Sequence, residues 1–257
     1  MCIGAIAGDV IGSRFEGKVK PSRKDFLLFN TKTCFTDDTV HTIALAESIL
    51  TGKDYVDRLR YYYRRYPYVG YGSAFKLWAK SNTVLEAYNS WGNGSAMRVS
   101  PISYIYDTIE EVMEGAKKSA EVTHSHEEGI KGAQAVAFSI FMIRMGAGKQ
   151  EVKTVMSDRF GYKLDKIYSL EEHGFDCSSM FTVPQSIAIF VQSDSFEDCI
   201  RKSICVGGDT DTTACISGSI AGAYYRVIPK FIQLEALKIL PRDFIKVISE
   251  FSKKYEQ

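Results

Sequence analysis

Residues 3–12, IGAIAGDVIG, place a glycine at every fourth position. A helix has about 3.6 residues per turn, so Gly4, Gly8 and Gly12 would lie on one face and leave it without side chains. Either a second helix or a ligand can approach a bare face closely. The stretch has no basic leader and is interrupted by Asp9, so we expect no secretory signal.

Two short acidic clusters stand where apolar helical patterns begin: TDD at residues 36–38 and DTDT at residues 209–212. A helix N-cap needs one side-chain oxygen, so the second aspartate of each cluster is surplus to capping. Neighbouring carboxylates repel one another and favour a compensating cation. Carboxylate and hydroxyl oxygens without thiolates suit Mg²⁺, Mn²⁺ or Ca²⁺ better than zinc or copper. The duplication therefore favours a split metal site over two simple caps.

The composition of the 257 residues is that of an ordinary globular protein, with a formal net charge of +1. This charge gives no overall field for nucleic acid or an anionic membrane, so an anionic ligand needs local neutralisation. The six cysteines contain no C-x-x-C pair, which predicts reduced thiols and a cytoplasmic location. No apolar run is long enough to predict a membrane span.

Helical periodicity dominates the chain. We expect one all-α domain over residues 1–257, whose core uses helices from both halves and so brings the two acidic clusters together. The expected helices are 3–12, 39–51, 54–66, 73–80, 83–88, 108–122, 127–146, 183–192, 196–205, 211–226 and 242–255. Residues 150–176 are more polar and predict one short helix and an exposed loop. Ser125 and Glu128 have the spacing of a capping box for the helix at 127–146.

Five motifs follow one another in order: GDVIGSRFE at 8–16, FTDDT at 35–39, GNGSAMR at 92–98, THSH at 123–126 and GGDTDT at 207–212. Together they resemble the ADP-ribosylglycohydrolase family, the group that includes the dinitrogenase-reductase-activating glycohydrolase, and above all its small bacterial-type members. The resemblance covers the chain from about residue 3 to 225. It implies an orthogonal all-α helical bundle with two divalent cations, Mg²⁺ or Mn²⁺, at the bottom of a cleft.

The resemblance also implies roles for individual residues. The implied metal ligands are Thr36, Asp37, Asp38, Asp209, Asp211 and Thr212. The implied catalytic residues are Glu16, Asp37, Asp38 and Asp211, where Glu16 matches a glutamate beside the metals and the scissile ribose. The implied substrate contacts are Gly92, Asn93, Gly94, Ser95, Met97, His124 and Gly208. Backbone N–H groups of Gly92, Gly94 and Ser95, in a turn leading to a helix, would suit the diphosphate.

The implied activity is hydrolysis of the glycosidic bond at ribose C1″, which releases ADP-ribose from a modified protein side chain or nucleic acid. Two metals would orient the ribose hydroxyls and activate a water, and Glu16 or an aspartate would accept its proton, without a covalent intermediate. Two alternatives stay open: a hydrolase of small ADP-ribose conjugates or nucleotides, and a catalytically silent ADP-ribose-binding protein. We expect a monomer or weak oligomer.

The sequence allows two interpretations for several residues. Arg98 either forms a structural ion pair or touches phosphate. His124 and His126 lack a third nitrogen or sulfur ligand at helical spacing, which disfavours zinc. His41 stands where near relatives would have an apolar residue, and Glu127 where proline is common.

Aromatic residues near the motifs have two interpretations as well. The basic run at residues 58–66, RLRYYYRRY, fits a helix with inward aromatic side chains better than a surface for nucleic acid. Tyr68, Tyr71 and Trp91 could stack on adenine, but core packing explains each of them equally well.

Overall fold

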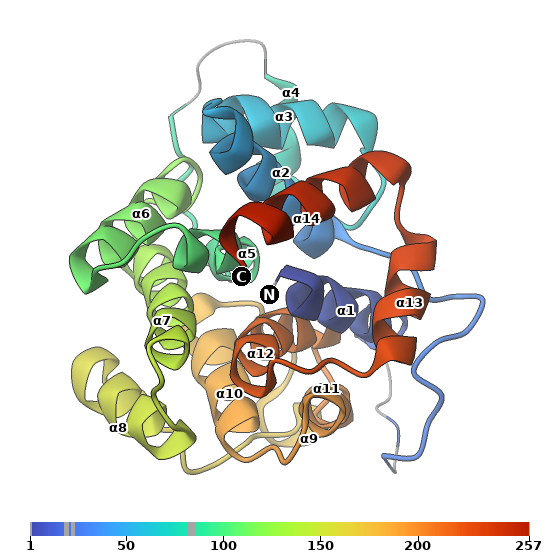
Figure 1. Ribbon diagram of the computed structural model, residues 1–257, viewed down its shortest axis with the longest axis vertical. Coiled ribbons are helices and arrows are strands. Elements are labelled where there is room, and N and C mark those ends of the chain that lie inside the picture. Colours follow the sequence, from blue (N-terminus) through green and yellow to red (C-terminus); the bar gives the residue numbers. More distant parts are fainter. Residues whose placement is uncertain (1, 18–20, 22–23, 82–85, 257) are drawn as a thin grey trace.

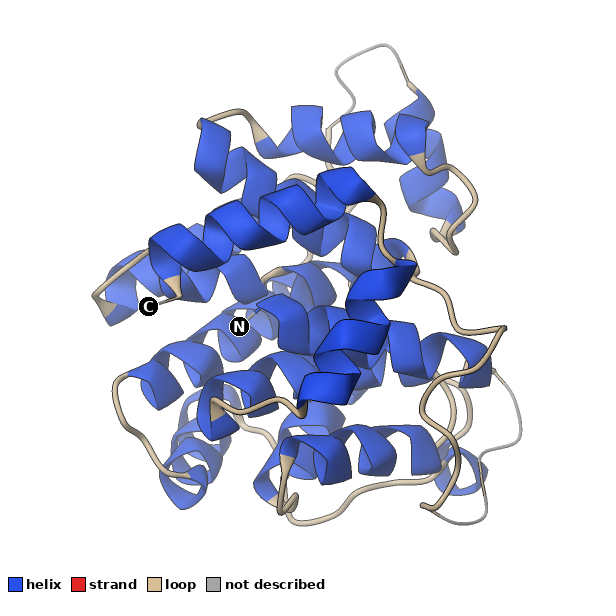
Figure 2. Ribbon diagram, turned by 45° about the vertical axis from the view of Figure 1, so that its right-hand side comes forward, coloured by secondary structure: helices blue, strands red, loops and turns tan. Residues whose placement is uncertain are grey.

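The computed structural model describes residues 2–17, 21, 24–81 and 86–256. Within these ranges the chain forms helices and no strand, which confirms the all-α prediction (Figures 1 and 2). The helices are α1 (Cys2–Gly12), η1 (Ser13–Phe15, a 3₁₀ helix), α2 (Asp37–Thr51), α3 (Tyr55–Arg65), α4 (Ser73–Lys80), α5 (Gly94–Arg98), η2 (Ser100–Tyr104, also 3₁₀), α6 (Ile109–Glu121), α7 (Glu127–Arg144), α8 (Lys149–Phe160), α9 (Leu170–His173), α10 (Ser179–Val191), α11 (Phe196–Cys205), α12 (Thr210–Tyr225), α13 (Lys230–Ile239) and α14 (Arg242–Tyr255).

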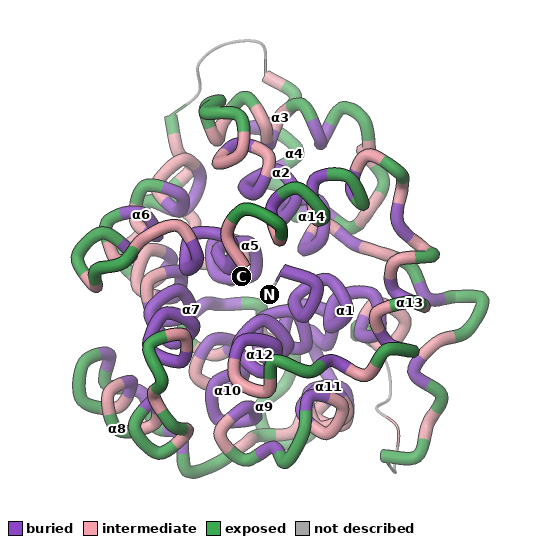
Figure 3. Tube along the Cα trace, in the orientation of Figure 1, coloured by how far each residue is buried: buried purple, intermediate pink, exposed green. Residues whose placement is uncertain are grey.

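Helices α1 and α12 form the centre of the molecule, and the other helices surround them (Figure 1). Every residue of α1 is buried, and so is α12 from Thr210 to Ala223 (Figure 3). Helix α1 is apolar except for Asp9, and α12 consists mainly of small apolar and hydroxyl side chains, which suits helices that are enclosed on all sides. The two ends of the chain meet beside this pair, where the Cys2 N–H donates to the Glu256 carboxylate at 2.6 Å.

The glycine face of α1 packs directly on the backbone of α12. A Cβ atom on Gly4 would lie 2.5 Å from the Gly218 carbonyl oxygen, and one on Gly8 would lie 2.0 Å from that of Ala214. Gly12 approaches Thr210 in the same way. Because residue numbers rise along α1 as they fall along α12, the helices are antiparallel. Of the two expected occupants of this bare face, the second helix is the one present.

Helix α2 leaves this centre with both ends capped. At its start the Thr36 side chain accepts a hydrogen bond from the Asp38 N–H, and at its end Gly52 adopts a left-handed conformation, with φ of 68°. A side-chain cap and a left-handed glycine satisfy groups that a helix leaves unpaired at its two ends. The first cap also fixes the direction in which the acidic cluster at 36–38 points.

Most expected helices are confirmed, and the exceptions have local causes. Residues 150–176 contain two helices, α8 and α9, where we expected one; Val152, Met156 and Phe160 form the buried stripe of α8. Helix α5 is the short helix expected after the turn at residues 92–95, whose bounds were not predicted. Helix α13 was not predicted, because it buries only Ile232 and Ala236.

Two other expectations need correction. Residues 86–88 of the expected helix 83–88 are not helical, and the rest of it lies outside the described residues. Helix α7 is capped by the His126 side chain, which accepts from the Glu128 N–H, and not by Ser125. No helix in the described ranges has the length and hydropathy to cross a bilayer. The single-domain boundary at 1–257 stays a prediction.

The glycine contact predicts a stability cost for any side chain on α1 at this face. Gly8→Ala should lower the free energy of unfolding by about 2 kcal/mol, although alanine favours helices, because the new methyl group would overlap the Ala214 carbonyl. Urea unfolding followed by circular dichroism measures this change. Gly148→Ala is the control, since no atom lies within 4 Å of a Cβ there; it should change the free energy by less than about 1 kcal/mol. Equal stability of the two variants would contradict the close contact.

Candidate metal and ligand site

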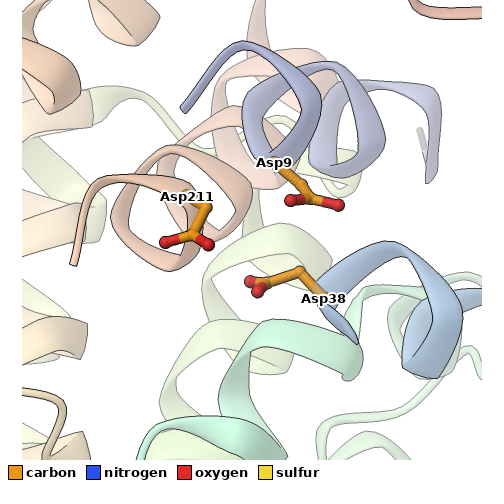
Figure 4. A group of neighbouring side chains, drawn as sticks. All are labelled: Asp9, Asp38 and Asp211. Carbon is orange, nitrogen blue, oxygen red and sulfur yellow. The ribbon is translucent and has the colours of Figure 1, made fainter. Parts of the chain in front are cut away.

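Three aspartates from distant parts of the chain meet in the interior: Asp9 on α1, and Asp38 and Asp211 in the first turns of α2 and α12 (Figure 4). A carboxylate oxygen of each lies within 4.8 Å of those of the other two, and all three residues are buried. Figure 4 shows the carboxylates pointing into one shared space. The contact between α1 and α12 thus brings Asp9 and Asp211 together, and the start of α2 adds Asp38.

A second acidic group shares Asp211. It includes Asp209, just before α12, and Glu16, which follows η1; their carboxylate oxygens and that of Asp211 lie within 4.8 Å of one another. Glu16 is exposed, whereas the two aspartates are buried. The Gly17 N–H donates to the Gly208 carbonyl at 2.9 Å, which ties the turn at Glu16 to the loop before α12.

Asp9 accepts four hydrogen bonds from the start of α2, three at Oδ2 and one at Oδ1. It accepts from the Thr36 N–H at 3.0 Å and hydroxyl at 2.7 Å, and from the Thr39 N–H at 3.1 Å and hydroxyl. These four donors offset part of the cost of burying the carboxylate and hold the turn that presents Asp38. Asp9 was not among the predicted site residues, because a single acid lacks the duplicated pattern. The available signal was the break that it makes in an apolar helix.

Asp38 keeps one oxygen uncommitted. Its Oδ2 lies 3.1 Å from the Thr36 hydroxyl and 3.3 Å from the Thr212 hydroxyl. Its Oδ1 is buried and has no hydrogen-bond partner among the residues that the structure describes. A buried carboxylate oxygen without a donor is costly unless a cation or a water satisfies it. Asp38 therefore has the available oxygen that a metal ligand requires.

Burial and mutual repulsion raise the pKa values of the clustered carboxyls. Burial, followed by the Asp9 and Asp209 carboxylates, raises the pKa of Asp37 to about 8. Burial is also the main cause that holds the pKa of Asp38 and of Asp211 well above the ordinary value. Neighbouring carboxylates of this kind are stabilised in the ionised form by a bound cation. With the hydroxyl of Thr212 beside them, they form a donor set that fits a hard divalent cation.

All the acidic residues named above except Asp9 line one cavity of about 570 Å³. This volume lies in the usual range for small-molecule sites. Most of the residues predicted for the site line it: Glu16, Asp37, Asp38, Gly92, Asn93, Gly94, Met97, His124, Asp209, Asp211 and Thr212. The unpredicted lining residues include His41, Phe75, Tyr88, Phe175 and Cys177.

Three predicted site residues do not line this cavity. Thr36 is buried behind Asp38, where its side chain caps α2. Ser95 is buried as well, and its hydroxyl donates to the Gly129 carbonyl at 2.7 Å. Gly208 lies in the loop before α12 with φ of 80°, a conformation that favours glycine. The structure thus gives each of the three a role in positioning the chain, and their ligand contacts stay predictions.

The loop at Gly92–Gly94 is joined to the acidic groups. The side-chain amide of Asn93 donates to the Asp209 carboxylate at 2.6 Å, so one side chain links the two parts of the cavity. The Gly92 N–H, which we expected to face a diphosphate, instead donates to the Ser90 hydroxyl at 3.1 Å. That expectation depended on the direction of the backbone, which the residue types alone do not specify.

Arg98 does not line the cavity, and it has no ion-pair partner in the described part of the chain. It is fully buried, and its guanidinium donates to the Ser119 carbonyl at 2.8 Å and to the Thr123 hydroxyl at 2.9 Å. The Thr123 hydroxyl lies 2.8 Å from Nδ1 of His124, which lines the cavity. Because His126 caps α7 and His124 lines the cavity, the two histidines have separate roles.

The aromatic candidates divide between the cavity and the core. Trp91 lines the cavity and is 55% exposed, whereas Tyr68 is 96% exposed and lies outside it. Tyr71 is buried and stacks on Phe75, with ring centroids 5.2 Å apart. The basic run at 58–66 forms α3 with Leu59, Tyr62 and Tyr63 buried, as expected for inward packing, and does not line the cavity.

Comparison with known proteins identifies the family of this chain. A family model described as ADP-ribosylglycohydrolase matches residues 1–255. The ADP-ribosylhydrolase ARH3 of Bos taurus is 25% identical and that of Homo sapiens 28% identical; the alignments cover 86% and 74% of this chain, and 83% and 70% of those proteins. The ADP-ribosylarginine hydrolase Tri1 of Serratia proteamaculans is 22% identical, with 74% of this chain and 59% of that protein covered.

A solved structure shares the arrangement of helices. It is described as an ADP-ribosylglycohydrolase-related protein complex and superposes with a TM-score of 0.76 at 23% identity, covering 98% of this chain and 94% of that chain. This similarity concerns the fold. The family match over nearly the whole chain shows more: the protein belongs to the ADP-ribosylglycohydrolase family and is a hydrolase of that family.

Proposed function

We propose that the protein is a metal-dependent hydrolase that cleaves the glycosidic bond at ribose C1″ and releases ADP-ribose from a modified target. The observation that carries the proposal is that acidic residues from α2, α12 and the turn after η1 line one cavity together with the Gly92–Gly94 loop and His124, while Asp9 of α1 joins Asp38 and Asp211 in one group of carboxylates. The names of the ARH3 and Tri1 relatives agree with it. Families of one fold can differ in chemistry, so the site itself must support the activity.

The acidic residues form two overlapping groups, which supports two cation positions. Asp9, Asp38 and Asp211 make one group, and Glu16, Asp209 and Asp211 make the other. Asp211 belongs to both groups, and Asp37 and Thr212 would supply further ligands. Divalent cations in this place, Mg²⁺ or Mn²⁺, would compensate the carboxylates, orient the ribose hydroxyls and make water a nucleophile at neutral pH.

The protein's own residues supply the remaining chemistry. Glu16 is exposed at the cavity and close to Asp209 and Asp211, so it is placed to accept a proton from the attacking water. Positive charge develops on the ribose as the glycosidic bond breaks. The neighbouring carboxylates would stabilise that charge, and His124 and the Gly92–Gly94 loop would hold the rest of ADP-ribose.

The lining of the cavity bears on the kind of target. A modified protein side chain fits better than nucleic acid, because the one basic aromatic segment, α3, does not line the cavity. Small ADP-ribose conjugates and a silent binding function are the alternatives. The uncommitted oxygen of Asp38 and the exposed Glu16 favour an active enzyme over a silent binder. A cytoplasmic location and a monomeric or weakly associated state stay predictions.

The activity can be tested on a panel of substrates. Purified protein with Mg²⁺ or Mn²⁺ should release ADP-ribose from ADP-ribosylated arginine, serine, nucleic acid or a small conjugate, and the released ADP-ribose can be measured by chromatography. Chelation with EDTA should abolish release, and added metal should restore it. ADP-ribose binding without release from any substrate would identify a silent binder. Release that resists EDTA would contradict the metal requirement.

Asp38 allows a test of the metal site by stability. At a concentration of about a hundred times its dissociation constant, Mg²⁺ or Mn²⁺ should stabilise the wild type by about 2.7 kcal/mol, which corresponds to a Tm increase of roughly 5 °C or more. Asp38→Asn should lose most of this increase and lower turnover by about a hundredfold. Without metal, the same variant should be at least as stable as the wild type, because it removes one of several repelling carboxylates.

The control is Asp158→Asn, an exposed aspartate on α8 that is remote from the cavity. It should keep the full metal-dependent Tm increase in differential scanning fluorimetry. If Asp38→Asn kept that increase as well, Asp38 would not be a metal ligand. If Asp38→Asn were less stable than the wild type in the absence of metal, the role of Asp38 would be structural.

A further inference from the structure

Part of the cavity wall belongs to residues 168–178, which contain the short helix α9 and which we call the strap. Phe175 and Cys177 of the strap line the cavity, and both are exposed. Residues 171–175 are exposed throughout, so the strap buries little apolar surface. A segment of this kind is held mainly by hydrogen bonds, and its position depends on the groups to which it is bonded.

Gln185 of α10 holds the first residue of the strap. Its side chain is buried, with 5% of its surface exposed. Its Oε1 accepts from the Tyr168 N–H at 3.1 Å, and its Nε2 donates to the Tyr168 carbonyl at 2.5 Å. Because an N–H only donates and a carbonyl only accepts, these two bonds fix which way the amide points. A primary amide supplies both the donor and the acceptor, whereas a methionine of similar size supplies no donor.

The strap is in turn bonded to two loops beside Asp209. The Leu170 N–H donates to the Val206 carbonyl at 2.7 Å, in the loop before α12. The Cys177 carbonyl accepts from the Asn93 N–H at 2.9 Å. The side-chain amide of Asn93 donates to the Asp209 carboxylate. The strap therefore joins α10 to both loops that approach Asp209.

We propose that Gln185 is a positioning residue, whose side-chain amide fixes the strap so that Phe175 and Cys177 form a wall for bound ADP-ribose. Gln185 itself does not line the cavity, so it acts on the ligand through the strap. The bond between Asn93 and Cys177 extends this effect to the Gly92–Gly94 loop. That the ligand is ADP-ribose rests on the proposed function, whereas the fixing of the strap by Gln185 does not.

Hydrogen exchange tests the fixing of the strap without any ligand. In Gln185→Met the amides of Leu170 and Asn93 should exchange at least about tenfold faster than in the wild type, because the strap that both contact has lost two hydrogen bonds. Neither N–H is bonded to Gln185, so their exchange reports the position of the strap and not the lost bonds themselves. Exchange at single amides can be measured by NMR spectroscopy. Gln185→Glu keeps the acceptor and loses the donor, and it should change exchange in the same direction.

Affinity for ADP-ribose tests the wall. In calorimetric titrations with Mg²⁺ present, Gln185→Met should bind ADP-ribose about tenfold more weakly than the wild type, because the ligand would have to order the strap. Gln134→Met is the matched control: the Gln134 amide also donates to a backbone carbonyl on another helix, that of Met113 at 3.1 Å, but it does not line the cavity. Its affinity should equal that of the wild type, with unchanged exchange at Leu170 and Asn93.

The wild type allows a test that depends on no variant. With ADP-ribose at about a hundred times its dissociation constant and Mg²⁺ present, Cys177 should react with iodoacetamide at least about tenfold more slowly, because the bound ligand covers it. Cys34 is also exposed and does not line the cavity, so its rate should not change. Mass spectrometry of the labelled peptides distinguishes the two thiols.

The outcomes separate this proposal from the proposed function. Unchanged exchange in Gln185→Met, faster exchange with unchanged affinity, or equal losses in Gln134→Met would overturn the proposal. An unprotected Cys177 in a wild type that binds and releases ADP-ribose would overturn the proposal alone. A wild type that neither binds nor releases ADP-ribose, with the expected exchange in Gln185→Met, would overturn the proposed function and leave the fixing of the strap supported.

Discussion

The backbone contact between α1 and α12 is the constraint on which the site depends. Gly8 lies so close to α12 that a single methyl group would overlap the Ala214 carbonyl. Asp9 follows Gly8, and Asp211 lies one turn before Ala214, so the spacing of the helices sets the spacing of the two carboxylates. A helix pair separated by ordinary side chains would stand an additional ångström or more apart. The glycines therefore determine the geometry of the acidic cluster although they are not part of it.

Burial in this enclosed site raises the free energy of the ionised carboxylates and makes them suitable for binding a cation. Buried in a chain of net charge +1, they cannot rely on a general positive field, and their raised pKa values reflect this isolation. A protein selected for stability alone would replace some of them. Their retention at the cavity, beside a hydroxyl and with one oxygen of Asp38 unsatisfied, is best explained by a ligand that compensates their charge.

The sequence predicts the parts of this structure that repeat a pattern. Amphipathic helices such as α6 and α11 follow from their period, and Asp38 and Asp211 follow from the surplus of acids in each cluster. Asp9 could not be predicted as a site residue, because its role comes from four donors on another helix. Ser95 has a suitable residue type, yet its hydroxyl turns towards Gly129. Such orientations depend on tertiary packing, which a local pattern does not contain.

The available oxygen of Asp38 depends on a residue that does not itself reach the cavity. Asp9 accepts four hydrogen bonds from Thr36 and Thr39, and these bonds fix the turn that presents Asp38, whose Oδ1 has no partner in the described part of the chain. The side-chain amide of Asn93 then joins the acidic residues to the Gly92–Gly94 loop through Asp209. The cavity thus combines carboxylate oxygens, which suit a divalent cation, with a loop and an imidazole that can contact the rest of a ligand, and this is the combination that the proposed function requires.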